Sequence, residues 1–170
     1  MSNAIATLDP ETVFRTADSL NGAARHLASL PYYRQSLRNV HTGFWQLHYN
    51  YGTALYNATL ETEARNGLSL YAVRSSWERV ACMREAMQEI LAAERLARTP
   101  RDLALVRTTR ARMLWLWGLP WETFTAYRGA QYADPADRAL ALQADGYMDL
   151  LRSPATSGLA EPGAQGPASH

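Results

Sequence analysis

The chain contains a helix break at Arg98-Thr99-Pro100-Arg101-Asp102, and this break constrains the fold more than any other feature of the sequence. A threonine side chain can cap a helix, proline suits the first helical position, and an acidic residue is favoured in the first turn. Apolar residues at helical spacing lie on both sides of the break. The sequence therefore predicts long helices that fold back on each other as a hairpin.

The region before the break carries apolar residues separated alternately by three and four positions. We expect one long helix from Pro31 to Asn66 and another from about Ser69 to Arg98. Such spacing places the apolar side chains along a seam that packs on another helix. The candidate residues for the helix seam and for self-association are Phe44, Tyr51, Leu55, Trp77, Val80 and Met87.

Further start and stop signals divide the chain after the break. Gly118 is predicted to end the helix that begins at Pro100, since glycine readily adopts the left-handed conformation found after helices. A short segment is expected from Pro120 to near Gly129, and a last helix is expected to start at Asp134. No strand alternation of any length competes with these helices.

These signals predict an all-α fold, in which a long antiparallel helical hairpin is extended to a three- or four-helix bundle. Asp9 precedes Pro10 and marks the first helix start. We therefore expect a flexible N-terminus over residues 1–9 and one helical domain over residues 10–152. Residues 153–170 are rich in Pro, Gly, Ala and Ser, a composition typical of a disordered tail.

The sequence carries little reactive chemistry. Cys82 is the only cysteine, so neither an intrachain disulfide nor a cysteine-based zinc site is expected, and a reducing, cytoplasmic setting is favoured. None of the histidines has a Glu three residues before it, as a di-iron bundle requires. Phosphate-binding loops and nucleophile elbows are also missing from the sequence. We expect a non-enzymatic protein without catalytic residues, metal or cofactor.

Membrane insertion and secretion are not expected. The longest apolar stretch, over residues 113–121, is much shorter than the ~20 residues that span a bilayer. Residues 1–9 do not have the basic start and apolar core of a secretory signal peptide.

The basic residues are all arginine and gather in the middle of the chain. The net charge is +1, but residues 67–117 hold nine Arg against five acidic residues, whereas residues 118–170 hold three against six. Six of these arginines lie close together in the sequence: Arg95, Arg98, Arg101, Arg107, Arg110 and Arg112. This arginine cluster could bind phosphates. Because its members belong to two helices and do not form one stripe, nucleic-acid binding is a second alternative.

Tryptophans gather near the end of the helix that follows the break. Trp115, Trp117 and Trp121 are candidates to enter an apolar surface, because indole rings suit the boundary between an apolar phase and water. The same residues would also serve as ordinary core. The spacing alone leaves both interpretations open.

Two segments resemble the phasins, helical proteins that coat polyhydroxyalkanoate storage granules in bacteria. They are YGTALYNATLE at 51–61 and MREAMQEILAAERLARTPRDLALV at 83–106, within a resemblance over about residues 45–112. The break ARTPRDL at 97–103 is similar to the phasin break between two long amphipathic helices. The chain departs from the pattern by having tryptophans and no lysine.

The phasin resemblance implies a self-associating helical protein that covers an apolar surface such as a polyester granule. Its expected partners are copies of itself and a hydrophobic polymer. The alternative is a structural or adaptor helical module that binds a protein partner. The resemblance brings no catalytic residues.

The composition of residues 153–170 generates a first prediction. Removal of these residues should leave the thermal unfolding midpoint nearly unchanged, because disordered segments make few buried contacts. Calorimetry of the full chain and of the shortened chain measures this. A large drop in the midpoint would show instead that the tail docks on the helical domain.

Overall fold

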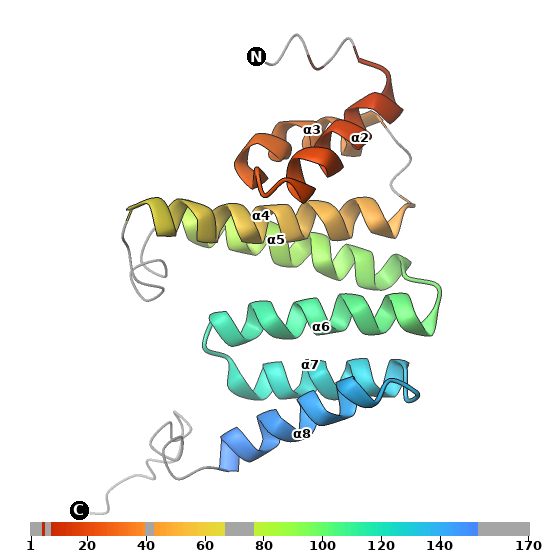
Figure 1. The fold of residues 1–170 in the computed structure, drawn as a ribbon, viewed down its shortest axis with the longest axis vertical. Helices are drawn as coiled ribbons and strands as arrows, with labels where there is room; N and C mark the ends of the chain where they lie inside the picture. Colours follow the sequence, from red (N-terminus) through yellow and green to blue (C-terminus); the bar gives the residue numbers. More distant parts are fainter. Residues whose placement is uncertain (1–4, 6–7, 40–42, 67–76, 153–170) are drawn as a thin grey trace, which may run out of the picture.

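The computed structural model describes residues 5, 8–39, 43–66 and 77–152, and within these ranges the chain is helical without any strand (Figure 1). The all-α fold class is therefore confirmed. The expected tail over 153–170 and the start expected near Ser69 lie outside the described residues. The helices are α2 Pro10–Gly22, α3 His26–Asn39, α4 Trp45–Asn66, α5 Trp77–Leu96, α6 Pro100–Leu116, α7 Pro120–Ala133 and α8 Arg138–Arg152.

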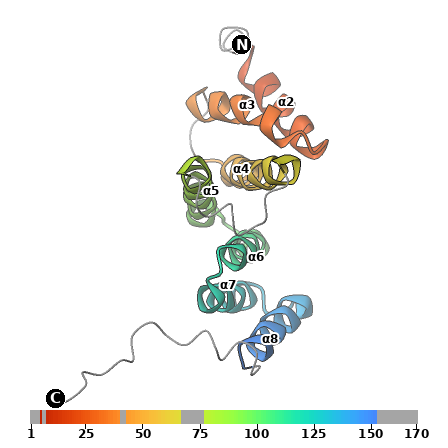
Figure 2. The ribbon, with the colours of Figure 1, turned by 90° about the vertical axis from the view of Figure 1, so that its left-hand side faces the viewer.

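The helices stack in chain order, and each packs chiefly on the helices next to it in the sequence. Figures 1 and 2 show the α2–α3 pair at one end, then α4 with α5, then α6 with α7, and α8 at the other end. Successive helices run in opposite directions from α4 to α7 (Figure 1). The main core lies between α2 and α6, and smaller apolar clusters join α6, α7 and α8.

The α4–α5 hairpin is the most extensive contact in the array. Tyr51 and Leu55 of α4 and Ile90 of α5 are fully buried at this contact. At Gly52, a Cβ atom would lie 3.0 Å from the Ile90 side chain and 3.1 Å from the carbonyl oxygen of Ala86. The missing side chain of Gly52 therefore lets the two helix backbones approach closely.

Polar side chains attach the α2–α3 pair to this hairpin. Asp18 of α2 accepts hydrogen bonds from the Tyr33 hydroxyl at 2.6 Å and from the Asn50 amide at 3.0 Å. Arg34 of α3 donates from Nε to the Tyr51 hydroxyl at 2.8 Å. Burial, as the largest cause, raises the pKa of both phenols, so both hydroxyls remain protonated donors at neutral pH.

Three of the predicted helix ends have the expected chemistry. Asp9 caps α2 by accepting from the Thr12 amide at 3.0 Å, and Thr99 caps α6 by accepting from the Asp102 amide at 3.1 Å. Gly118 follows α6 with φ of 69°, in the left-handed region that favours glycine. These ends depend on residues close in sequence, so the sequence was sufficient to predict them.

The predicted single helix from Pro31 to Asn66 is wrong. α3 ends at Asn39 and α4 begins at Trp45, with the exposed Gly43 just before it. Pro31 lies inside α3 instead of starting a helix. Pro31 lies in the second turn of α3, so its missing N–H costs one backbone hydrogen bond within the helix.

Two boundaries after Gly118 also differ from the prediction. α7 continues through Gly129 to Ala133, and the Arg107 side chain packs on Gly129 and donates to its carbonyl oxygen at 2.8 Å. α8 begins at Arg138 and not at Asp134. A later acidic residue supplies the start, since Asp137 accepts from the Ala139 amide at 2.9 Å.

The close crossing at Gly52 generates a second prediction. Gly52→Ala should lower the free energy of unfolding by about 1–3 kcal/mol, because the new methyl group must displace Ile90 or the α5 backbone. The matched control is Gly146→Ala in α8, where an added Cβ meets nothing within 4 Å. This control should raise the stability by about 0.5–1 kcal/mol through helix propensity. Urea unfolding of both variants measures the difference, and a stabilised Gly52→Ala would contradict the close crossing.

Candidate functional site

The tryptophans lie around the turn between α6 and α7, where we define the tryptophan patch as Trp115, Trp117 and Trp121. Trp121 is 58% exposed and Trp115 is 40% exposed, whereas Trp117 is half-buried. Single exposed apolar side chains are ordinary on a monomer surface, whereas exposed apolar residues that gather commonly mark binding sites. The patch is therefore the strongest candidate interaction site in the described part of the chain.

The turn joins the helix ends that carry these residues. Trp115 lies in the last turn of α6 and Trp121 in the first turn of α7, so the two helices present them at the same end of the pair (Figure 1). The backbone between them is tied down, because the Gly118 amide donates to the Trp115 carbonyl at 2.9 Å and the Leu119 amide donates to the Leu114 carbonyl at 3.1 Å. A short turn with fixed hydrogen bonds holds the patch in place.

Two stacked tyrosines pack against one side of Trp115. Its ring lies 5.1 Å from the Tyr147 ring of α8 in an edge-to-face arrangement, and Tyr147 stacks on Tyr127 of α7 at 4.6 Å. Burial, followed by the neighbouring Tyr127 hydroxyl, raises the pKa of Tyr147 to about 12. We call Tyr127, Tyr147 and Trp115 the aromatic column. Trp115 thus contributes both to the core and to the surface.

The predicted seam residues have different environments. Tyr51 and Leu55 are fully buried between α4 and α5, and Val80 and Met87 are partly buried on α5. Phe44 precedes α4, is 48% exposed and packs edge-on against Phe14 of α2 at 6.2 Å, so it does not continue the α4 seam. Trp77 begins α5, but its side chain lies outside the described residues.

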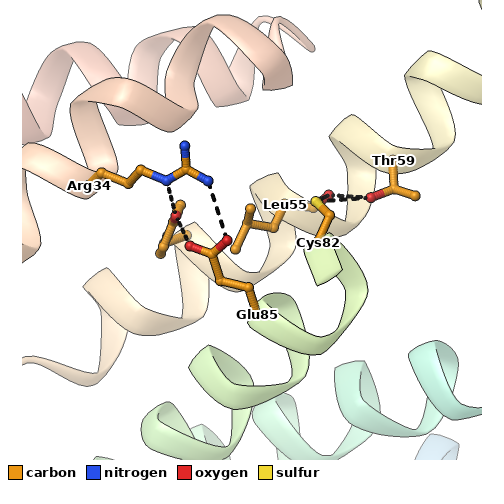
Figure 3. Close-up of polar contacts among 6 residues, drawn as sticks. Arg34, Leu55, Thr59, Cys82 and Glu85 are labelled. Atoms are coloured by element: carbon orange, nitrogen blue, oxygen red, sulfur yellow. Dashed lines mark hydrogen bonds and ion pairs between the residues drawn. The ribbon is translucent and has the colours of Figure 1, made fainter. Parts of the chain in front are cut away.

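A polar group at the α3–α4–α5 junction is the clearest cluster of reactive side chains (Figure 3). The Tyr51 hydroxyl donates to Glu85 and accepts from Arg34, whose Nη2 lies 3.3 Å from Glu85 Oε2. All three side chains bond one another across three helices. This arrangement fixes the helices relative to one another, as a structural network does.

Other polar side chains of the α4–α5 hairpin also form hydrogen bonds. The Cys82 thiol lies 3.3 Å from the Thr59 hydroxyl and donates to the Leu55 carbonyl at 3.6 Å (Figure 3). His48 lies 2.6 Å from Glu89, but His48 is eleven positions from Thr59, or roughly 16 Å along α4. Neither contact gives Cys82 the adjacent base that an activated thiol needs.

Part of the arginine cluster is used to hold helices together. Glu94 of α5 accepts from Arg107 at 2.8 Å and from Arg110 at 2.5 Å, both on α6. Arg107 also bonds the carbonyl of Gly129 on α7. These two arginines therefore join three helices. The exposed members of the cluster are Arg95, Arg98, Arg101 and Arg112.

The described ranges show neither a group of metal ligands nor a helix that could span a membrane. Among these residues, His, Cys, Asp and Glu side chains do not gather in a group of three that could hold a metal ion. In the described ranges, every helix is too short or too polar to cross a bilayer.

The comparisons with known proteins give no family model and no curated protein that matches the sequence. The resemblance to the phasins therefore stays a prediction.

The role of Glu94 generates a third prediction. Glu94→Gln should lower the free energy of unfolding by about 2–4 kcal/mol, because it leaves the largely buried Arg107 and Arg110 without their carboxylate. The matched control is Glu11→Gln, which breaks the highly exposed pair with Arg15 and should cost less than about 1 kcal/mol. Urea unfolding compares the two, and equal losses would contradict the helix-joining role.

Proposed function

We propose that this protein is a non-catalytic helical module that binds a protein partner through the tryptophan patch. The main support for this proposal is that Trp115 and Trp121 are both exposed near the turn between α6 and α7. Tryptophan is enriched among the residues that contribute most to protein–protein binding. The aromatic column holds the Trp115 side chain in one geometry, and the turn fixes the backbone beside it, which reduces the entropy lost on binding.

The surroundings of the patch favour a protein partner over a polymer surface. Arg112 lies one turn before Trp115, Glu122 lies next to Trp121, and both are exposed. Small apolar anchors bordered by charges are typical of protein interfaces. A helix that coats an apolar phase needs a long continuous apolar face. In the described part of the α4–α5 hairpin, the large side chains of Leu47, Tyr51, Leu55 and Ile90 are buried in the core instead.

The architecture also supports binding. Helix pairs stacked in chain order form scaffolds whose surfaces are used for recognition. The described polar clusters, around Glu85 and Glu94, bond residues of neighbouring helices. Their role in holding the array together supports a scaffold function without chemistry.

A photo-crosslinking experiment tests the proposal. A photoreactive residue placed at Thr125, one turn after Trp121 and exposed, should crosslink one protein in cells that express this chain. The matched control is the same residue at Tyr132, which is 77% exposed at the other end of α7. With the crosslinked protein purified, Trp121→Ser should weaken binding at least tenfold, or about 1.4 kcal/mol, whereas Tyr132→Ser should not.

The same variants distinguish a protein partner from a polymer surface. The protein should not partition onto polyester or alkane droplets more than its Trp121→Ser variant does. Partitioning that requires Trp121, without a specific protein crosslink at Thr125, would contradict the proposal and support the granule coat. Helicity measured by circular dichroism should stay unchanged in every variant, because the substituted side chains are mostly exposed.

A further inference from the structure

The solvent-facing side of α5 carries arginines. Arg84 and Arg95 are both exposed and lie eleven positions apart, which is three helical turns with a drift of only about 20°. They therefore share one face of α5, roughly 16 Å apart along its axis. The exposed Gln88 lies between them on the same face. Ala86 and Ile90, which are buried against α4, lie on the opposite side of the helix.

Two more exposed arginines lie around the turn between α5 and α6. Arg98 follows α5, and Arg101 lies in the first turn of α6. Arg98 is three residues from both Arg95 and Arg101, so its Cα atom lies within about 11 Å of each of theirs. The positive charge of α5 therefore continues around the turn. We call Arg84, Arg95, Arg98 and Arg101 the arginine face.

The arginine face has no ion-pair partner among the residues that the structure describes. The side chains of its four members form neither an ion pair nor a hydrogen bond there. The glutamates of α5 whose side chains are described, Glu85, Glu89 and Glu94, are each bound to a basic side chain of another helix. In its described part, α5 therefore directs negative charge toward neighbouring helices and positive charge toward solvent.

The composition of the arginine face favours a phosphate backbone as its ligand. Arginine presents a planar fork of donors that can bind one phosphate at two points. A protein interface has an apolar core, and a helix that binds a membrane surface needs a long apolar side. In the described part of α5, large apolar side chains are not exposed, and Leu91 beside the face is half-buried. Leu105 of α6 is exposed one turn after Arg101, but single exposed leucines are ordinary.

The length of the arginine face fits a nucleic-acid duplex. A DNA duplex carries one negative charge per about 1.7 Å of its axis, so a row of roughly 16 Å between Arg84 and Arg95 can reach several phosphates at once. Single strands are bound largely by stacking of bases on aromatic side chains. The exposed Trp115 and Trp121 lie at the other end of α6 from this face (Figure 1). Contacts of the face are therefore to the backbone, which carries no sequence information directly.

We propose that the arginine face binds the phosphate backbone of a nucleic-acid duplex without reading its sequence. This inference does not rest on the proposed function, because it concerns another surface and another class of partner. The net charge of the chain is only +1, so the attraction is local to this face. The affinity should therefore lie in the range of non-specific binding, with a Kd of roughly 10⁻⁴–10⁻⁶ M at physiological salt.

The salt dependence of duplex binding tests the proposal. Fluorescence anisotropy of the full chain with a labelled DNA duplex is measured between about 50 and 200 mM salt. Log Kd should rise with log salt with a slope of about 3–4, because each neutralised phosphate contributes about 0.9. Arg95→Gln combined with Arg98→Gln should raise Kd at least tenfold at low salt and lower the slope by about two.

The matched control removes two exposed charges at the opposite ends of the array. Arg25→Gln combined with Arg152→Gln should leave both Kd and the slope nearly unchanged. Arg95→Lys combined with Arg98→Lys keeps the charge and should keep the slope. Absence of duplex binding at low salt, or wild-type binding by the Arg95→Gln and Arg98→Gln variant with native helicity, would overturn the proposal.

Two further probes distinguish the sources of negative charge. A duplex RNA of the same length shows which duplex the face prefers, and the paired glutamine substitutions should weaken binding to both. Poly-glutamate offers carboxylates in place of phosphates and should bind more weakly than the duplexes at the same salt concentration. Tighter binding of poly-glutamate would assign the face to an acidic protein segment and overturn the phosphate assignment.

Duplex binding and the protein partner are separable in the same variants. Trp121→Ser should weaken partner binding and leave the Kd for the duplex unchanged. The paired substitutions Arg95→Gln and Arg98→Gln should do the opposite. Loss of duplex binding in Trp121→Ser, with the paired substitutions without effect, would place nucleic-acid binding on the tryptophan patch and contradict the role of the arginine face.

Discussion

The close crossing of α4 and α5 is the contact on which the rest of the array depends. Gly52 lets Ile90 and the α5 backbone approach α4, and the flanking Tyr51 and Leu55 are fully buried there. The neighbouring helices α3 and α6 attach to this pair through specific polar groups. α3 bonds to it through Arg34, and α6 bonds to it through the carboxylate of Glu94. A change in the crossing would therefore move the attachment points of α3 and α6.

Local signals in the sequence predicted those helix ends that need only neighbouring residues. Asp9 and Thr99 cap helices with their own side chains, and Gly118 adopts the conformation that ends one. The errors occurred where distant residues decide. Gly129 does not end α7, and Arg107 from another helix packs on it and bonds its carbonyl. Periodicity could not reveal this contact, since it describes one helix at a time.

The candidate site was predictable only in part for the same reason. The sequence indicated that Trp115, Trp117 and Trp121 gather near one helix end, but helical spacing does not distinguish core from surface. Exposure depends on α8, whose Tyr147 supports one side of Trp115 while the other side remains at the surface. For the arginine cluster, the sequence did not reveal which residues pack between helices. Its high local charge suggested phosphate binding as an alternative, yet Arg107 and Arg110 join helices through Glu94.

The aromatic column joins the last three helices of the array. Near the N-terminal end, buried hydroxyls and carboxylates bond one another across α2, α3 and α4, so polar groups are consumed in holding helices together. At the other end, Tyr127, Tyr147 and Trp115 hold α6, α7 and α8 together through ring contacts. Rings can stabilise the interior with one face and remain available with the other. Trp115 of the aromatic column is therefore both a packing residue and a contact of the proposed binding site.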